Sequence, residues 1–257
     1  MPNQDASLRA LKRRMRGLLL DEDFGRAMTG LTALPPRRAV NPLFAFFCST
    51  TPLLRWRAVS GMGVVVSQLA ETRMESARVV MRRLMWTLND ESGGIGWGAP
   101  EAMGEITARH ARLAGEFAHI LVSYICPDGN FLEHPILQRG LLWGLGRLAH
   151  ARPEAAVGAE PFVRPFLAST DACHRGHAAW FVGAFARGTA DPDLQRLADD
   201  DAPFPFYQTG VLTEVTVADA ALGRLGRRHQ AVKDRTRKED CHDQHDRPHS
   251  NRNGGSL

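Results

Sequence analysis

Four segments of the chain follow the same pattern, and each ends on a glycine. These glycines lie 41, 42 and 37 residues apart, in the segments LRWRAVSGMG (54–63), IGWGAPEAMG (95–104), QRGLLWGLG (138–146) and RGHAAWFVG (175–183). A period near 40 residues is typical of stacked helical repeats, in which one unit cannot bury its apolar face without its neighbours. The sequence therefore predicts a solenoid.

Each repeat is predicted to hold two helices joined by a turn. The glycine segments carry apolar residues at helical spacing, as at Ala99, Ala102, Met103 and Ile106 of the second repeat. Another apolar helix precedes each glycine segment, at about 42–49, 75–88, 112–125 and 160–168. We call the first helix of a pair A and the second helix B. Four to five such pairs predict an all-α, right-handed helical-repeat solenoid.

This unit resembles the HEAT and armadillo repeats over about residues 40–190. The phrases SGGIGWGAPEAMGEI and GNFLEHPILQRGLLWGLGRLA are similar to those of a bacterial HEAT-like family of unassigned activity. Glycines in the B helices would let neighbouring helices approach closely, although each costs about 1 kcal/mol in helix propensity. The expected repeat-packing glycines are Gly63, Gly104, Gly146 and Gly183.

Both ends of the chain are predicted to cap the solenoid. Two helices, at 8–20 and 23–34, precede Pro35-Pro36, and a short helix is expected at 193–198. Strand-forming residues around Gln208-Thr209-Gly210 predict a small β-hairpin, followed by a closing helix at 218–229. The expected organisation is capping helices at 1–40, the solenoid at 41–190, a C-terminal cap with hairpin and helix at 191–230, and a disordered tail at 231–257.

The distribution of charge argues against a nucleic-acid-binding fold. The whole chain has a net charge of +4, but residues 41–223 carry 15 Lys and Arg against 19 Asp and Glu. A surface that holds phosphates should be basic where the fold is. Nucleic acid is therefore expected to bind only weakly, through the basic tail.

The sequence also lacks signals for a membrane or for disulfides. No apolar run reaches the roughly 18–20 residues of a membrane span, and the N-terminus shows no secretory signal. The four cysteines are widely spaced and form no CxxC motif. We expect a cytoplasmic protein with no membrane partner and no cofactor.

The glycine-rich stretch NDESGGIGWGAPE (89–101) fits no phosphate-binding motif. A Walker loop needs a lysine after its glycines and a preceding strand, and a dinucleotide fingerprint needs GxGxxG in a βαβ unit. The stretch has neither. Its position predicts the A–B turn of the second repeat, with Pro100 in the first turn of the B helix.

Polar residues nevertheless gather in the predicted A–B turns, which stack along one edge of a solenoid. Carboxylates and imidazoles at such an edge are able to bind a divalent metal or to act as acid and base. The candidate residues of this edge are Asp90, Glu101, Glu133, His134, Arg139, Cys173, His174 and His177.

Three hypotheses about function follow. A protein-binding or scaffold module is favoured over an enzyme, because stacked helix pairs offer an extended surface and the sequence holds no complete catalytic set. The alternative is a ligand- or metal-binding enzyme that uses the polar edge; a di-iron hydroxylase with a HEAT-like fold is similar to this chain in fold only. The second alternative is a nucleic-acid-binding protein, as in HEAT-like DNA glycosylases.

Overall fold

The computed structural model describes residues 2–89, 96–186 and 191–226. Its N-terminal part is a run of three helices, α1 (Pro2–Leu19), α2 (Phe24–Thr32) and α3 (Pro36–Phe47). Asp23 caps α2 by accepting a hydrogen bond from the backbone N–H of Arg26, as Asp does at helix starts. Pro36 stands in the first turn of α3, where its missing N–H is tolerated. Helix α3 therefore begins inside the range 1–40 that the sequence assigned to the cap.

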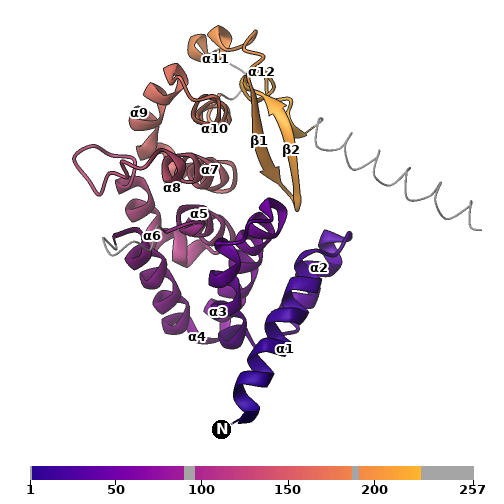
Figure 1. Cartoon of the computed structure of the whole chain (residues 1–257). Coiled ribbons are helices and arrows are strands. Elements are labelled where there is room, and N and C mark those ends of the chain that lie inside the picture. Colours follow the sequence, from indigo (N-terminus) through magenta and orange to yellow (C-terminus); the bar gives the residue numbers. More distant parts are fainter. Residues whose placement is uncertain (1, 90–95, 187–190, 227–257) are drawn as a thin grey trace, which may run out of the picture.

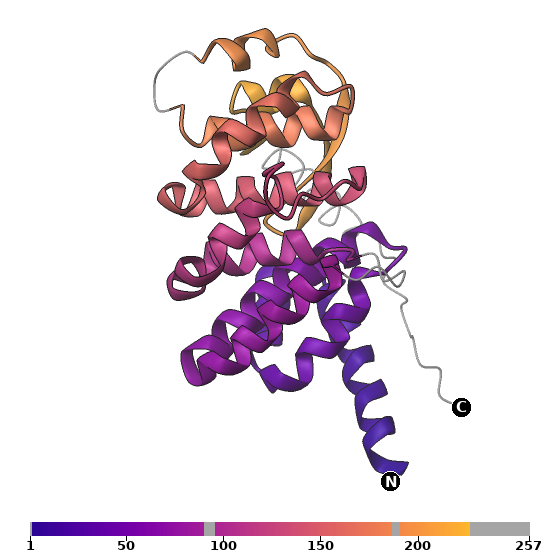
Figure 2. The same cartoon turned by 90° about the vertical axis from the view of Figure 1, so that its left-hand side faces the viewer.

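The middle of the chain forms two layers of helices. The inner layer contains the first half of α4, α5, α7 and α10, each packed on the next; the outer layer contains α3, the second half of α4, α6 and residues 153–168. Figure 2 shows these pairs stacked one above another. The bounds are α4 (Pro52–Asn89), α5 (Ala99–Arg109), α6 (Ala111–Ser123), α7 (Pro135–Ala151) and α10 (Ala172–Gly183).

Single extended residues connect the inner layer to the outer layer. Arg73 interrupts α4 with φ −150° and ψ 70°, which divides this 38-residue helix into a B half and an A half. His110 and Arg152 take similar extended conformations at the ends of α5 and α7. His110 also caps α6, because its Nδ1 accepts a hydrogen bond from the backbone N–H of Leu113. One extended residue is enough to reverse the chain at these corners.

The last outer segment is not the continuous helix predicted at 160–168. It is divided into α8 (Pro153–Ala156), a 3-10 turn η1 (Val157–Ala159), α9 (Glu160–Val163) and a second 3-10 turn η2 (Arg164–Ala168). Pro153, Pro161 and Pro165 recur through these 16 residues. Each proline lacks an N–H donor and clashes with the preceding turn, so a regular helix is broken at these positions.

The C-terminal part is an antiparallel hairpin between two short helices. The elements are α11 (Pro192–Arg196), β1 (Pro203–Gln208), β2 (Val211–Thr216) and α12 (Val217–Ala221). Gln208 pairs with Val211, so Thr209 and Gly210 form a two-residue turn in which both have positive φ. This is the type I′ geometry favoured by the twist of a hairpin.

The predicted closing helix at 218–229 is wrong in its extent. Helix α12 stops at Ala221, and Gly223 follows with φ +64°. A left-handed glycine just after the last turn is a common helix terminator. The tail predicted at 231–257 lies outside the described residues.

The hairpin lies along the inner layer. Figure 1 shows β1 and β2 beside the column of helices, and Figure 2 shows them behind it. The Trp143 indole N–H donates to the backbone oxygen of Tyr207, and Arg57 donates to the backbone oxygens of Gly210, Leu19 and Asp21. Arg57 therefore joins the N-terminal helices, the first B helix and the hairpin turn.

The predicted fold class is confirmed: the chain is an all-α repeat of stacked helix pairs with one small hairpin near the C-terminal end. Its core runs continuously from Met15 to Leu225. In the part of the chain that the structure describes, no helix combines the length and apolar character needed to cross a bilayer.

Candidate functional sites: a polar edge, an outer groove and an inner pocket

The polar side chains predicted to form the A–B edge have separate local contacts wherever the structure describes them. Asp90 lies outside the described residues. Glu133 and His134 are exposed. His134 caps α7 through Nδ1, which accepts a hydrogen bond from the backbone N–H of Ile136 at 3.2 Å, and its ring stands edge-on to Trp97. No hydrogen bond or ion pair joins Glu133 to another predicted edge residue among the described residues.

Arg139 joins two repeats at this edge. Its Nε donates to Oδ2 of Asp171 at 2.8 Å, while Oδ1 of Asp171 accepts hydrogen bonds from the backbone N–H groups of Cys173 and His174. Asp171 is thus the N-cap of α10. Cys173 is half-buried, and burial raises the pKa of its thiol. The pair ties the start of α7 to the start of α10.

The two histidines of α10 are buried. His174 bonds through one ring nitrogen to the hydroxyl of Ser169 and through the other to the backbone oxygen of Pro135. His177 packs against Phe204 of β1, and neither of its ring nitrogens makes a well-formed hydrogen bond among the described residues. Burial, together with the neighbouring His174, lowers the pKa of His177 to about 3. The His177 ring is therefore neutral at physiological pH.

Glu101 stands apart from these side chains, in the first turn of α5. Its carboxyl group fills the space left by Gly140 of α7, where an added Cβ would lie 2.4 Å from the carboxyl carbon. Oε2 is enclosed and has no hydrogen-bond partner among the described residues, and burial raises the pKa of Glu101 to about 7. Across residues 2–89, 96–186 and 191–226, no three His, Cys, Asp or Glu side chains are placed to share a metal ion.

The four expected packing glycines have different surroundings. An added Cβ at Gly104 would lie 2.4 Å from Cα of Gly144, so α5 and α7 meet backbone to backbone. At Gly146 it would meet the ring of Trp180 at 2.5 Å, and at Gly63 it would meet Cγ of Glu105 at 2.5 Å. At Gly183 nothing lies within 4 Å, so the close approach expected there is absent among the described residues.

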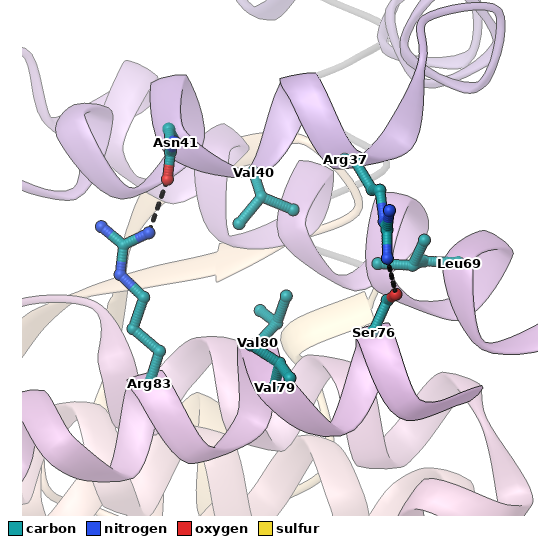
Figure 3. A pocket seen from close by; sticks show the side chains of 8 residues that line it. All are labelled: Arg37, Val40, Asn41, Leu69, Ser76, Val79, Val80 and Arg83. Carbon is teal, nitrogen blue, oxygen red and sulfur yellow. Dashed lines mark hydrogen bonds between the residues drawn. The ribbon is translucent and has the colours of Figure 1, made fainter. Parts of the chain in front are cut away.

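A groove opens on the outer layer between α3 and the second half of α4. It has a volume of about 240 Å³, and we call it the outer groove. Figure 3 shows its apolar side chains between two arginines: Arg37 donates to the hydroxyl of Ser76 at 2.8 Å, and Arg83 donates to Oδ1 of Asn41 at 2.5 Å. The lining residues are Arg37, Val40, Asn41, Leu69, Ser76, Val79, Val80 and Arg83.

Two apolar side chains on the face of α4 that carries Val79 are exposed to solvent. Val79 is 53% exposed and Trp86 is 73% exposed, and the two stand seven residues apart on one helix, hence on one face. The guanidinium of Arg83 lies 4.0 Å above the ring of Phe44, which holds that arginine over apolar surface. An A helix was predicted at 75–88, but the face that carries Val79 and Trp86 was not predicted to be a site.

A second pocket lies on the inner layer, under the hairpin turn. It measures about 270 Å³, and we call it the inner pocket. It brings together α2, four inner helices and the hairpin, from positions spread over most of the chain. Its lining residues are Phe24, Ser60, Glu105, Arg109, Trp143, Arg147, His150, Trp180, Tyr207, Gln208 and Thr209.

The sequence did hold a signal for part of this pocket. Glu105 and Arg109 are four residues apart on one helix, and Arg147 follows Glu105 after 42 residues, one repeat period. The candidate residues predicted from the sequence lie in and beside the turns and do not include these B-helix positions.

No protein-family model and no curated protein matches the chain. Among solved structures, it is similar to a designed armadillo repeat protein in complex with the peptide (KR)4, at 15% identity over 82% of this chain and 98% of that chain, with a TM-score of 0.45. A second designed armadillo repeat protein gives 15% identity, 83% and 98% coverage and a TM-score of 0.45. An engineered protein gives 16% identity, 84% and 95% coverage and a TM-score of 0.44.

The arrangement of the helices themselves defines the fold. B helices pack on B helices through α4, α5, α7 and α10, and the A helices pair along the opposite layer, where Arg78 of α4 binds Glu116 of α6. By this stacking of its helix pairs, the chain has a helical-repeat fold, as the resemblance of its sequence to HEAT and armadillo repeats predicts.

Proposed function

We propose that this protein is a protein-binding module and that its outer groove docks an acidic, amphipathic helix of a partner. The observation that carries the proposal is an apolar groove flanked by arginines, with exposed Val79 in its lining and exposed Trp86 seven residues further along the same helix face. An amphipathic helix that lies in an apolar groove is a recurrent mode of protein recognition.

The apolar part of the groove supplies the anchoring surface. Val40, Leu69 and Val80 form a buried floor, and Val79 stands exposed beside them. Trp86 adds exposed apolar surface on the same face of α4. Tryptophan is enriched among residues that dominate the binding energy of interfaces. A partner helix with apolar residues at i, i+3, i+4 and i+7 presents a stripe that matches this surface.

The charged part of the groove selects an acidic partner. Two arginines and no Asp or Glu line it. Arg37 and Arg83 donate to neutral oxygens of Ser76 and Asn41, so their positive charges are not neutralised by the bonds they make in the groove. Opposite charges at the rim of an apolar contact speed association and exclude partners of the wrong sign.

The inner layer is a poorer place for such a partner. Its face is covered by the protein's own hairpin, with Phe204, Phe206 and Tyr207 buried against the helices. Tyr207 stacks on Trp56 with ring centroids 5.2 Å apart, and its hydroxyl bonds to that of Ser60. A long peptide would have to displace these contacts. The enzyme and nucleic-acid alternatives, like the cytoplasmic location, stay predictions.

Selection of helical peptides from a random display library on the full-length protein tests the proposal. We expect enriched peptides to combine an apolar stripe with Asp and Glu. Val79→Asp should weaken their binding at least tenfold, because it places a carboxylate at the centre of the apolar surface and repels an acidic helix.

Val157→Asp is the matched control, since Val157 is 51% exposed and lies in η1, a different repeat. It should leave binding unchanged. Peptides that bind Val79→Asp as tightly as the natural protein, a library that enriches basic stripes, or the absence of any enrichment would overturn the proposal.

A further inference from the structure

The inner pocket contains a buried carboxylate held between two arginines. Oε1 of Glu105 accepts a hydrogen bond from Nε of Arg109 at 2.5 Å, and Oε2 accepts one from Nε of Arg147 at 2.7 Å. Glu105 is only 3% exposed. The three side chains form one ion cluster that joins α5 to α7.

This ion cluster carries one more positive charge than negative charge. Among the lining residues the charged groups are two arginines and one glutamate, which leaves one positive charge in excess. His150 adds none at neutral pH, because burial lowers the pKa of its imidazole. An unpaired charge in a partly buried site is unfavourable unless another group compensates it, so the pocket is electrostatically suited to an anion.

Both arginines also keep N–H donors that Glu105 does not use. Each uses its Nε on Glu105, and their terminal nitrogens make no hydrogen bond within the described residues. The Arg109 and Arg147 side chains line the pocket and are 33% and 30% exposed, so a ligand in the pocket can contact them. Because Glu105 fixes each guanidinium at one edge, the other edge is presented to a ligand with little loss of side-chain freedom.

Gly63 makes space for this arrangement. An added Cβ at position 63 would lie 2.5 Å from Cγ of Glu105 and 3.0 Å from Cδ of Arg109. The first inner helix therefore meets the ion cluster with a bare backbone. The glycine that the repeat pattern singled out for helix packing in fact accommodates charged side chains.

Aromatic rings form the walls of the pocket. Trp143 and Tyr207 are almost fully buried, and the His150 ring stacks on Trp180 with centroids 4.9 Å apart and planes 20° apart. The hydroxyls of Ser60 and Tyr207 are 2.8 Å apart, so one donates to the other and the acceptor keeps its own O–H. Flat apolar walls next to guanidinium and hydroxyl donors match a ligand that has a ring and an anionic head.

We propose that the inner pocket binds a small organic oxyanion, with a carboxylate or phosphate on Arg109 and Arg147 and a flat apolar ring against the aromatic wall. The planar guanidinium fork matches both carboxylate and phosphate oxygens. The volume of about 270 Å³ is just below the usual range of drug-sized ligand sites, which limits the ligand to a small molecule. This proposal does not depend on the outer groove.

Calorimetric titration of the full-length protein with benzoate and with phenyl phosphate tests it, with benzyl alcohol as the neutral analogue. We expect saturable binding of at least one oxyanion and none of the alcohol at the same concentrations. The tighter of the two identifies the anionic head that the site prefers. Arg147→Gln should weaken binding about tenfold or more, because it removes charge-assisted hydrogen bonds to the anion.

Arg112→Gln is the control, since Arg112 is exposed on α6 and binds Glu116 instead. It should bind as the natural protein does. Arg109→Gln provides a second pocket variant, and circular dichroism verifies the folding of each. Equal affinity for benzyl alcohol, no binding of either oxyanion, or unchanged affinity in the folded Arg109→Gln or Arg147→Gln protein would overturn the proposal.

Discussion

The inner and outer layers are built from the same helix pairs, yet the contacts between their helices differ. In the inner layer, α5 and α7 touch backbone to backbone at Gly104 and Gly144, and the hairpin covers the remaining face. In the outer layer, α3 and the second half of α4 leave a groove of about 240 Å³, with Val79 and Trp86 exposed beside it.

The difference shows how one repeat unit produces two kinds of surface. Glycine at the contact points of the inner layer lets the helices approach one another closely. The larger side chains of the same helices line a small pocket. Valine and arginine at the contacts of the outer layer keep the helices apart and leave apolar surface open to a partner. The inner layer thus suits a small ligand, and the outer layer suits a helix.

The largest effect is expected from a methyl group added where two inner helices touch. Gly104→Ala places its Cβ 2.4 Å from the backbone of Gly144, which no side-chain movement relieves. We expect a loss of about 3 kcal/mol in the free energy of unfolding, at the upper end of overpacking effects. Urea denaturation followed by circular dichroism measures it.

The same change in the outer layer should act in the opposite direction. Gly115 is exposed within α6 and has nothing within 4 Å of its added Cβ. Gly115→Ala should stabilise the protein by about 0.5–1 kcal/mol through helix propensity. The contrast between the layers fails if Gly104→Ala is as stable as the natural protein, or if Gly115→Ala is equally damaging.

An effect of pH is also expected, because one carboxyl group in each layer has a pKa shifted in the opposite direction from the other. Burial raises the pKa of Glu101 to about 7, whereas its hydrogen bond with Arg78 lowers the pKa of Glu116 to about 2. Between pH 4.5 and 7, folded Glu101 keeps a proton that the unfolded chain loses, so stability falls as pH rises through this window. Glu116 contributes stability above about pH 4.5 that is lost as pH falls towards 2.

Unfolding free energies measured at several pH values separate the two groups. Glu101→Gln should be more stable than the natural protein at pH 8 by about 3 kcal/mol, and near it at pH 4.5. Glu116→Gln should keep the natural slope between pH 5 and 8 and differ below pH 4.5. An unchanged slope in Glu101→Gln would show that this carboxyl group is already ionised at neutral pH.

The repeat and the hairpin could be predicted from the sequence, because both follow from local patterns. The periodic B helices and the Thr209-Gly210 turn are each encoded within a few residues. The prediction of one helix at 160–168 was wrong although three prolines argued against it within 153–165. Helix α12 ends at Ala221, earlier than predicted, because Gly223 takes a left-handed conformation that stops the helix.

The two sites were harder to predict, because they depend on contacts between distant segments. The hairpin turn reaches Arg57, 153 residues earlier in the chain, and no local pattern encodes this docking. Helical periodicity also does not specify that Trp86 is 73% exposed. The predicted polar edge follows from stacked turns, but in the part of the chain that the structure describes no three of its His, Cys, Asp or Glu side chains are placed to share a metal ion.

Hydrogen–deuterium exchange of the full-length protein, with and without a helical peptide selected on it, tests the division between the layers most directly. The peptide should slow exchange in α3 (Pro36–Phe47) and in residues 74–89 of α4, and leave β1 and β2 unchanged, because a helix bound in the outer groove restrains only the elements that line it. Protection that appears instead in the hairpin or the inner helices would contradict the account, because it would place the partner on the face that the protein's own strands cover.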